Sequence, residues 1–161
     1  SKILAPGLRV GYVSAAEPII QKIIVCKQVA DVHTNIWAQV LCERFLATQN
    51  IEQHLAGLQK IYRHKCNLML EGMEQHFSRK ITWTKPEGGL FIWGEFKDKS
   101  ADLDKCFVDC VTKTSTAYVA GSSFFADEGI NNCLRFNYSN ATVEQIETGI
   151  KRLAAYFKEN F

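Results

Sequence analysis

The chain is 161 residues long, with 47% hydrophobic and 22% charged residues, which is enough to bury one apolar core and excludes an intrinsically disordered chain. Its formal net charge of +2 is spread along the sequence without a basic block, so we expect this segment to bind no nucleic acid. Because no apolar run approaches the ~18 to 20 residues of a membrane span, we expect a soluble, cytoplasmic protein that makes no membrane contact.

The beginning of the chain predicts a loop, a short strand and two helices. Residues 1–16 contain a Pro-Gly pair and lead into an apolar strand at Leu8–Val13. Apolar side chains at helical spacing indicate a helix around residues 19–25 and another from about residue 36 to residue 47. We expect both helices to pack against something larger than this segment.

One long helix is predicted over residues 51–77, which contain no proline and repeat apolar residues at mostly helical spacing. At ~1.5 Å rise per residue such a helix spans roughly 40 Å, so it can connect two domains. The remainder predicts a compact α+β unit. Its expected elements are a strand at 81–83, a turn at 86–89, a strand at 90–93, a helix at 101–112, strands at 117–119 and 133–138, and a helix at 142–157.

Two local patterns refine this unit. The strands on either side of the turn at 86–89 are expected to pair as a hairpin. Thr142, followed three residues later by Gln145, is typical of a capping box at the start of the last helix.

The six cysteines are scattered and form no CxxC pair, so we interpret them as reduced and mostly buried. Cys106 and Cys110 lie four residues apart on a predicted helix, but a zinc site needs two further ligands. The histidines show no such convergence. The sequence therefore predicts no metal site.

A lysine and an arginine flank the tight turn within residues 1–12, SKILAPGLRVGY. Lys2 becomes a nucleophile when its amine loses a proton, and Arg9 offers a planar fork that suits a phosphate group. The alternative is that both are ordinary solvated residues, which is the commoner outcome for an arbitrary lysine-arginine pair.

Arg135 lies within an otherwise apolar strand, where a charged side chain needs a partner or an exit to water. A guanidinium binds a carboxylate through two parallel hydrogen bonds and could orient a substrate in this way. The alternative is a salt bridge to an acidic neighbour.

Three segments in the same order resemble the C-terminal part of class I/II aminotransferases, which are fold-type I enzymes that use pyridoxal 5'-phosphate (PLP). Residues 1–12 resemble the lysine segment, and residues 86–93 resemble the turn and strand of the small domain. Residues 120–125 and 132–139 resemble a glycine loop and the strand that carries the substrate-binding arginine. Ala120 stands where that loop usually has proline, which leaves its rigidity open.

The resemblance implies roles for three residues. Lys2 is the lysine that bonds to PLP, Arg9 binds the cofactor phosphate, and Arg135 binds the α-carboxylate of the substrate. It also implies an α/β parent fold, of which this chain is mainly the α+β small domain with a long linking helix. Residues 1–50 are then the incomplete edge of the PLP-binding large domain with its linking helices, and residues 51–161 the interdomain helix and small domain.

The implied activity is transfer of an amino group between an amino acid and a 2-oxo acid by a homodimeric enzyme. Six residues separate Lys2 from Arg9, one fewer than in the aspartate aminotransferase group. This interval resembles the branch that contains 2-aminoadipate, kynurenine and valine-pyruvate aminotransferases.

Two alternatives remain open. The same branch includes aminotransferase-like effector domains of bacterial transcriptional regulators, and another fold-type I PLP reaction, by a lyase or a decarboxylase, would keep Lys2 and Arg9. In this family the residues that contact the cofactor ring and the rest of its phosphate site precede the lysine. We therefore expect this segment alone neither to bind PLP tightly nor to catalyse transamination.

Overall fold

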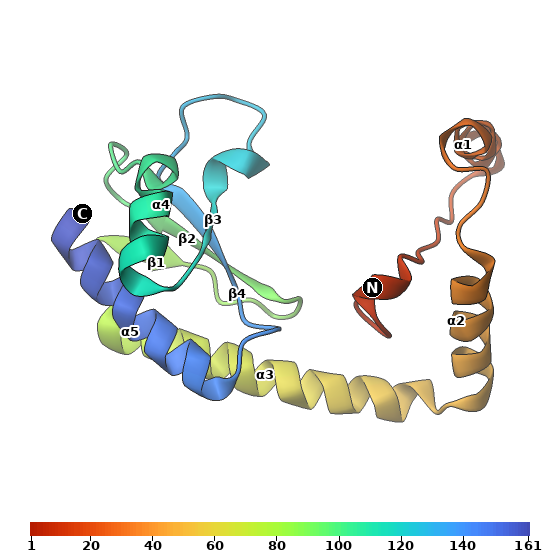
Figure 1. The fold of residues 1–161 in the computed structure, drawn as a ribbon, viewed down its shortest axis with the longest axis horizontal. Coiled ribbons are helices and arrows are strands. Elements are labelled where there is room, and N and C mark those ends of the chain that lie inside the picture. Colours follow the sequence, from red (N-terminus) through yellow and green to blue (C-terminus); the bar gives the residue numbers. More distant parts are fainter. The chain divides into compact units, whose positions relative to one another are not determined.

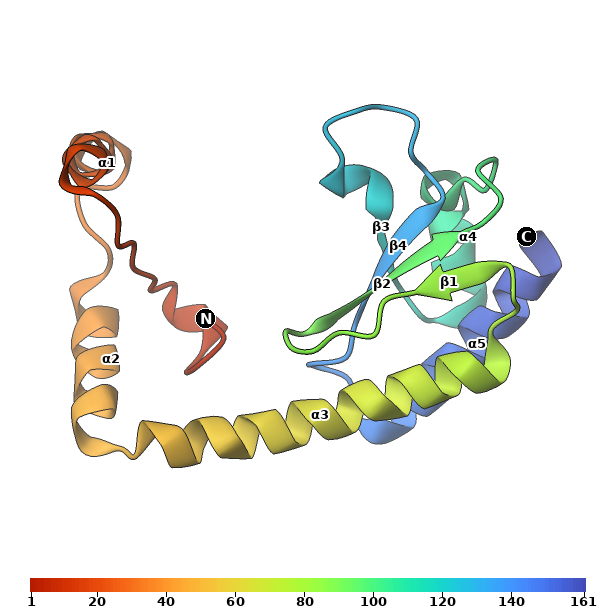
Figure 2. The same cartoon turned by 180° about the vertical axis from the view of Figure 1, so that it is seen from behind.

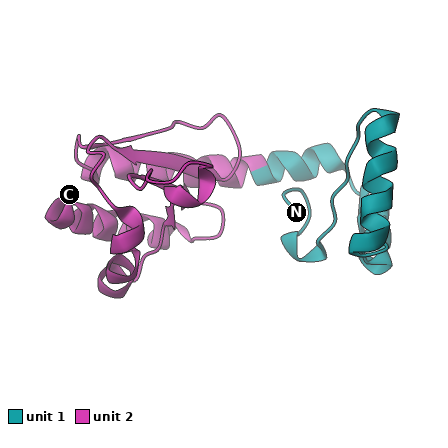
Figure 3. Ribbon diagram, turned by 90° about the horizontal axis from the view of Figure 1, so that it is seen from above, with its two compact units in different colours: residues 1–58 teal, residues 59–161 magenta.

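All 161 residues are described by a computed structural model, which divides into two units, residues 1–58 and 59–161 (Figure 3). The elements in chain order are the 3-10 turn η1 (Pro6–Leu8), helices α1 (Glu17–Ala30), α2 (Ile36–Thr48) and α3 (Ile51–His76), strands β1 (Ile81–Trp83) and β2 (Phe91–Phe96), helix α4 (Leu103–Thr114), strand β3 (Val119–Ala120), the 3-10 turn η2 (Gly121–Phe124), strand β4 (Cys133–Asn137) and helix α5 (Val143–Asn160). Helix α3 begins in the first unit and ends in the second.

The three predicted helices of the first 77 residues are confirmed as α1, α2 and α3. Proline near the start of α1 suits the first helical turn, and Asn35 caps α2 by accepting a hydrogen bond from the backbone N–H of Ala38. The predicted strand at Leu8–Val13 is wrong, because η1 occupies its start and the rest is irregular. A strand forms only when a neighbouring strand pairs with its backbone N–H and C=O groups. All four strands lie in the second unit, so Leu8–Val13 in the first unit has no strand to pair with.

The first unit contains no buried residue. Several of its large apolar side chains are mostly exposed. The exposed fraction is 97% for Tyr12, 88% for Val29 and 79% for Trp37. Helices α1 and α2 therefore have no core of their own.

The second unit contains a four-stranded sheet in the order β1-β2-β4-β3, with every pair antiparallel. The predicted hairpin is confirmed as β1 and β2, although β2 runs three residues further than expected, to Phe96. The strand expected at residues 117–119 is shifted to Val119–Ala120, because only these residues pair with β4. The predicted α+β architecture is thereby confirmed.

The two faces of the sheet differ. In an antiparallel pair, directly opposite residues share a face, so Ile92 and Phe136 point to one side while Trp93 and Arg135 point to the other. The first side is the core face, where Ile92 is fully buried and packs with residues of α3, α4 and α5. Arg135 therefore lies on the side of the sheet opposite the core.

Helix α5 runs beside the C-terminal half of α3 (Figures 1 and 2). The contact is close, since a Cβ at Gly72 would lie 3.3 Å from Cγ2 of Ile150. The predicted capping box of α5 is confirmed, with Gln145 N–H donating to Thr142 Oγ1 and Thr142 N–H donating to Gln145 Oε1. No helix combines the length and apolar character needed to cross a membrane.

Candidate functional site

The turn at Pro6–Leu8 sets the position of Arg9. Arg9 adopts the left-handed conformation, with φ 52° and ψ 35°, which is uncommon for a residue other than glycine. Its backbone N–H donates to the carbonyl of Pro6 at 3.2 Å, and its Nη1 donates to the same oxygen at 3.1 Å. The exposed guanidinium thus keeps most of its N–H groups free.

Lys2 is exposed, and its amine makes no hydrogen bond or ion pair within the chain. The segment that carries it is nevertheless anchored, because the His54 ring donates from Nε2 to the carbonyl oxygen of Ile3 at 2.7 Å. His54 also packs edge-on against Phe45, with ring centroids 5.1 Å apart. His54 was not predicted, and no local sequence pattern indicates a contact across 51 positions.

Arg135 is held in the middle of the sheet. On β4 it faces Trp93 of β2 on one side and Val119 of β3 on the other. Strand pairing on both sides fixes its Cα, so the side chain projects from a rigid element.

No carboxylate neutralises this arginine. The ion pairs of the chain are Lys27 with Asp31, Glu95 with Lys99, and Asp109 with Lys113, so the salt bridge considered for Arg135 is not formed. Its Nε is buried and has no hydrogen-bond partner. An unsatisfied buried donor costs about 1 to 3 kcal/mol, more when the group is charged, so Arg135 is held at this position at a cost to stability.

Two aromatic rings lie against the guanidinium instead. Cζ of Arg135 is 3.9 Å from the ring centroid of Phe91 and 4.5 Å from that of Phe124. Both distances are within the range of a cation–π interaction. Neither ring was predicted as part of the site. The sequence feature that could have indicated them is the aromatic residues within the family-like segments at 86–93 and 120–125.

The cysteines are free, but only three of the six are buried, so the expectation of mostly buried thiols is too broad. Cys26 is exposed, and Cys42 and Cys106 are intermediate. Burial raises the pKa of the three buried thiols, which are Cys66, Cys110 and Cys133, and keeps them protonated and weakly nucleophilic. No group of three or more histidine, cysteine, aspartate or glutamate side chains is gathered in metal-binding geometry.

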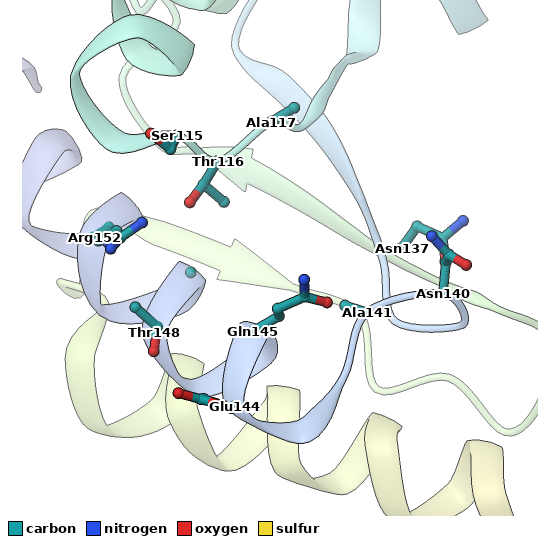
Figure 4. A pocket seen from close by; sticks show the side chains of 11 residues that line it. Ser115, Thr116, Ala117, Asn137, Asn140, Ala141, Glu144, Gln145, Thr148 and Arg152 are labelled. Carbon is teal, nitrogen blue, oxygen red and sulfur yellow. The ribbon is translucent and has the colours of Figure 1, made fainter.

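A cavity of about 730 Å³ opens on the second unit between the end of α4 and the beginning of α5 (Figure 4). Its walls are mainly polar and include Thr116, Asn137, Gln145 and Arg152. Arg135 does not line it.

The predicted site residues are thus divided between the two units. Lys2 and Arg9 lie in the first unit, on either side of η1, and Arg135 lies in the second. Each of the three keeps hydrogen-bonding capacity that the chain itself does not use.

Comparison with known proteins gives one matching family, described as "Aminotransferase class I and II", over residues 2–153. The aromatic-amino-acid aminotransferase 1 of Thermococcus litoralis is 34% identical over 160 residues, covering 99% of this chain and 38% of that protein. A crystal structure of the kynurenine aminotransferase of Pyrococcus horikoshii, in complex with PMP, is similar with a TM-score of 0.91 and 38% identity, covering 99% of this chain and 39% of that one.

A more distant relative is named as an HTH-type transcriptional regulator, YdfD of Bacillus subtilis. It is 26% identical over 159 residues, covering 99% of this chain and 32% of that protein. The chain therefore spans well under half the length of each of these relatives.

Proposed function

Because the chain belongs to the class I and II aminotransferase family, we propose that the whole protein transfers an amino group between an amino acid and a 2-oxo acid with the help of PLP. The observation that carries this proposal is Arg135, a half-buried guanidinium on a rigid strand with no carboxylate of its own. Both substrates of such a reaction bring a carboxylate, which a guanidinium fork binds with two hydrogen bonds.

Lys2 and Arg9 are the residues proposed to hold PLP. They fit its chemistry, since a free primary amine can bond to an aldehyde carbon and a guanidinium with unused N–H groups can bind a phosphate. A Cβ at Gly7, in the turn between them, would meet nothing within 4 Å, so the space beside Gly7 is open. The relative from Pyrococcus horikoshii is described as bound to PMP, the aminated form of the same cofactor.

When bound, PLP supplies the electron sink that makes the substrate Cα proton acidic. The protein then provides position and proton transfer. Lys2 Nζ, released when the substrate amine takes its place on the cofactor, would move the proton from the substrate Cα to the cofactor carbon that takes up the amino group. Arg9 would hold the phosphate in place. Arg135 fixes the carboxylate and thereby the direction of the Cα–H bond.

The proposal extends to architecture. Residues 1–50 form the edge of the PLP-binding domain with its linking helices, and residues 51–161 form the interdomain helix and the small domain. The exposed apolar side chains of α1 and α2 support this division, because they require a larger body to cover them. We expect the whole protein to be a cytoplasmic homodimer, as the family resemblance implies.

Covalent trapping of the cofactor tests this function. Sodium borohydride reduces the bond between PLP and its lysine, and peptide mass spectrometry of the full-length protein then identifies the labelled residue. We expect the label on Lys2, its loss in Lys2→Ala, and its retention in Lys22→Ala, which removes another exposed lysine of the first unit. Absence of any label, or a label on a different lysine, would overturn the proposal.

The similarity to YdfD favours a second function, in which the segment senses PLP or an amino acid within a transcriptional regulator. Such a protein could carry the label on Lys2 without turnover. Measuring the 2-oxo acid formed from a panel of amino acids separates the two functions. Sustained formation of product supports the enzyme, whereas binding without product, together with specific DNA binding, supports the regulator.

A further inference from the structure

We propose that Phe91 and Phe124 are positioning residues for Arg135: their rings set the plane of the guanidinium so that its N–H edge is presented to the substrate carboxylate. The inference rests on the proposed function and extends it to residues that do not themselves bind the carboxylate.

No ion pair or side-chain hydrogen bond orients this guanidinium. It forms no ion pair, and its buried Nε makes no hydrogen bond. The two rings, whose centroids lie 3.9 Å and 4.5 Å from Cζ, are close enough to restrict its rotation.

Stacking is well suited to this task because it uses the faces of the guanidinium and leaves its edges free. A guanidinium has five N–H donors, all in its plane, and hydrogen bonds to neighbouring side chains would use some of them. Since Nε is covered, the end that carries Nη1 and Nη2 is the edge available for a bidentate contact.

The rings come from separate elements, and each is fixed in its own way. Phe91 lies on β2, two residues from Trp93, and is therefore a diagonal neighbour of Arg135 on the same face of the sheet. Phe124 ends the η2 turn, which Ser122 ties to α4 by donating from Oγ to Asp104 Oδ1 at 2.7 Å.

Trp93 supports the second ring and also provides a control. Its ring packs edge-on against Phe124, with centroids 5.7 Å apart, and against Phe125, with centroids 5.9 Å apart. The exposed fractions of Phe124 and Phe125 are similar, 46% and 39%. Only Phe124 stacks on the guanidinium, so the two neighbours differ in the one contact at issue.

The test uses the full-length protein loaded with PLP. Phe91→Leu and Phe124→Leu keep apolar volume but remove the aromatic face. Each is expected to raise the KM of the amino acid and of the 2-oxo acid together by about tenfold, with a smaller fall in kcat, because the loss is in carboxylate binding. Phe125→Leu should change either KM by less than about twofold.

Conservative variants separate positioning from a general structural role. Phe91→Tyr and Phe124→Tyr retain a ring face and should retain both KM values. A KM increase in the tyrosine variants equal to that in the leucine variants would overturn the proposal, and so would an equal effect of Phe125→Leu. If a leucine variant fails to fold, a rise of about tenfold in the KM of the matching tyrosine variant, which keeps the ring face, would still overturn the proposal.

Direct binding provides a readout other than turnover. The dissociation constant of 4-methylpentanoate, a carboxylate without an amino group, is measured by titration calorimetry and should rise about tenfold in both leucine variants. Arg135→Lys distinguishes failure of the ring proposal from failure of the carboxylate role of Arg135. If Arg135→Lys leaves KM and this dissociation constant unchanged, the carboxylate role of Arg135 in the proposed function fails. If Arg135→Lys raises KM and the dissociation constant but the leucine variants raise neither, only the ring proposal fails.

Discussion

The backbone of Gly121 lies against Cys133 so closely that a Cβ at Gly121 would be 2.4 Å from the Cys133 Cβ and 2.7 Å from its carbonyl carbon and oxygen. No real side chain tolerates such distances to backbone atoms. The η2 turn therefore rests directly on β4, two residues before Arg135, and glycine is the residue that permits it.

We expect Gly121→Ala to destabilise the second unit by about 1 to 3 kcal/mol, the usual cost of overpacking. The backbone must shift away from β4, and Phe124 shifts with it. Chemical denaturation of wild type and variant measures the difference. Gly88→Ala is the matched control, because a Cβ at Gly88 would meet nothing within 4 Å; a loss of stability as large in the control would refute the steric explanation.

Removing the capping box of α5 should also lower stability. Thr142→Ala eliminates the Oγ1 that accepts from the N–H of Gln145 at 3.2 Å, and we expect a loss of about 1 kcal/mol in the free energy of unfolding. Thr112→Ala, in the exposed interior of α4, should remain within about 0.5 kcal/mol of wild type. Equal effects of the two substitutions in thermal or denaturant unfolding would argue against the cap.

Stability should decline in alkaline solution because of buried tyrosines. Burial, with a smaller contribution from Cys66, raises the pKa of Tyr138 from 10.0 to about 12, and burial likewise raises the pKa of Tyr118 and Tyr156. The folded state then holds protons that the unfolded state releases, so the stabilisation is complete below pH 10 and is lost as the pH rises toward 12 and above.

Denaturant unfolding measured between pH 9 and pH 12 tests this dependence. Tyr138 contributes to this dependence mainly through its burial, and ionisation would also abolish the hydrogen bond that its hydroxyl donates to the carbonyl of Gly89 at 2.8 Å. Tyr138→Phe should reduce the slope of stability against pH in this interval. An unchanged slope would show that this hydroxyl titrates normally.

Residues 59–161 should fold without the first unit. Every buried apolar side chain, from Cys66 to Phe157, lies in this range, whereas residues 1–58 bury none. We expect a cooperative thermal transition and dispersed NMR spectra for the isolated second unit. Residues 1–58 alone should show neither, and cooperative unfolding of that fragment would contradict our account of its exposed helices.

Local structure was predictable wherever a short stretch carries its own signal. The helical period of residues 51–77 predicted α3, and the Thr142–Gln145 pair predicted the cap of α5. The predicted strand at Leu8–Val13 was wrong because a strand, unlike a helix, does not depend on local sequence alone. It forms only where another backbone segment pairs with its N–H and C=O groups.

The sequence alone was sufficient to select Lys2, Arg9 and Arg135, because each lies in a stretch of adjacent residues that resembles a segment of the aminotransferase family. Those roles stay predictions. What only the tertiary structure decided is the surroundings of Arg135: the absence of an acidic partner and the rings of Phe91 and Phe124 stacked on it. These residues come from β2, η2 and β4, and they meet because β2 pairs with β4 rather than with the strand that follows it in the chain. Such pairing depends on the packing of the whole unit, which no local period encodes.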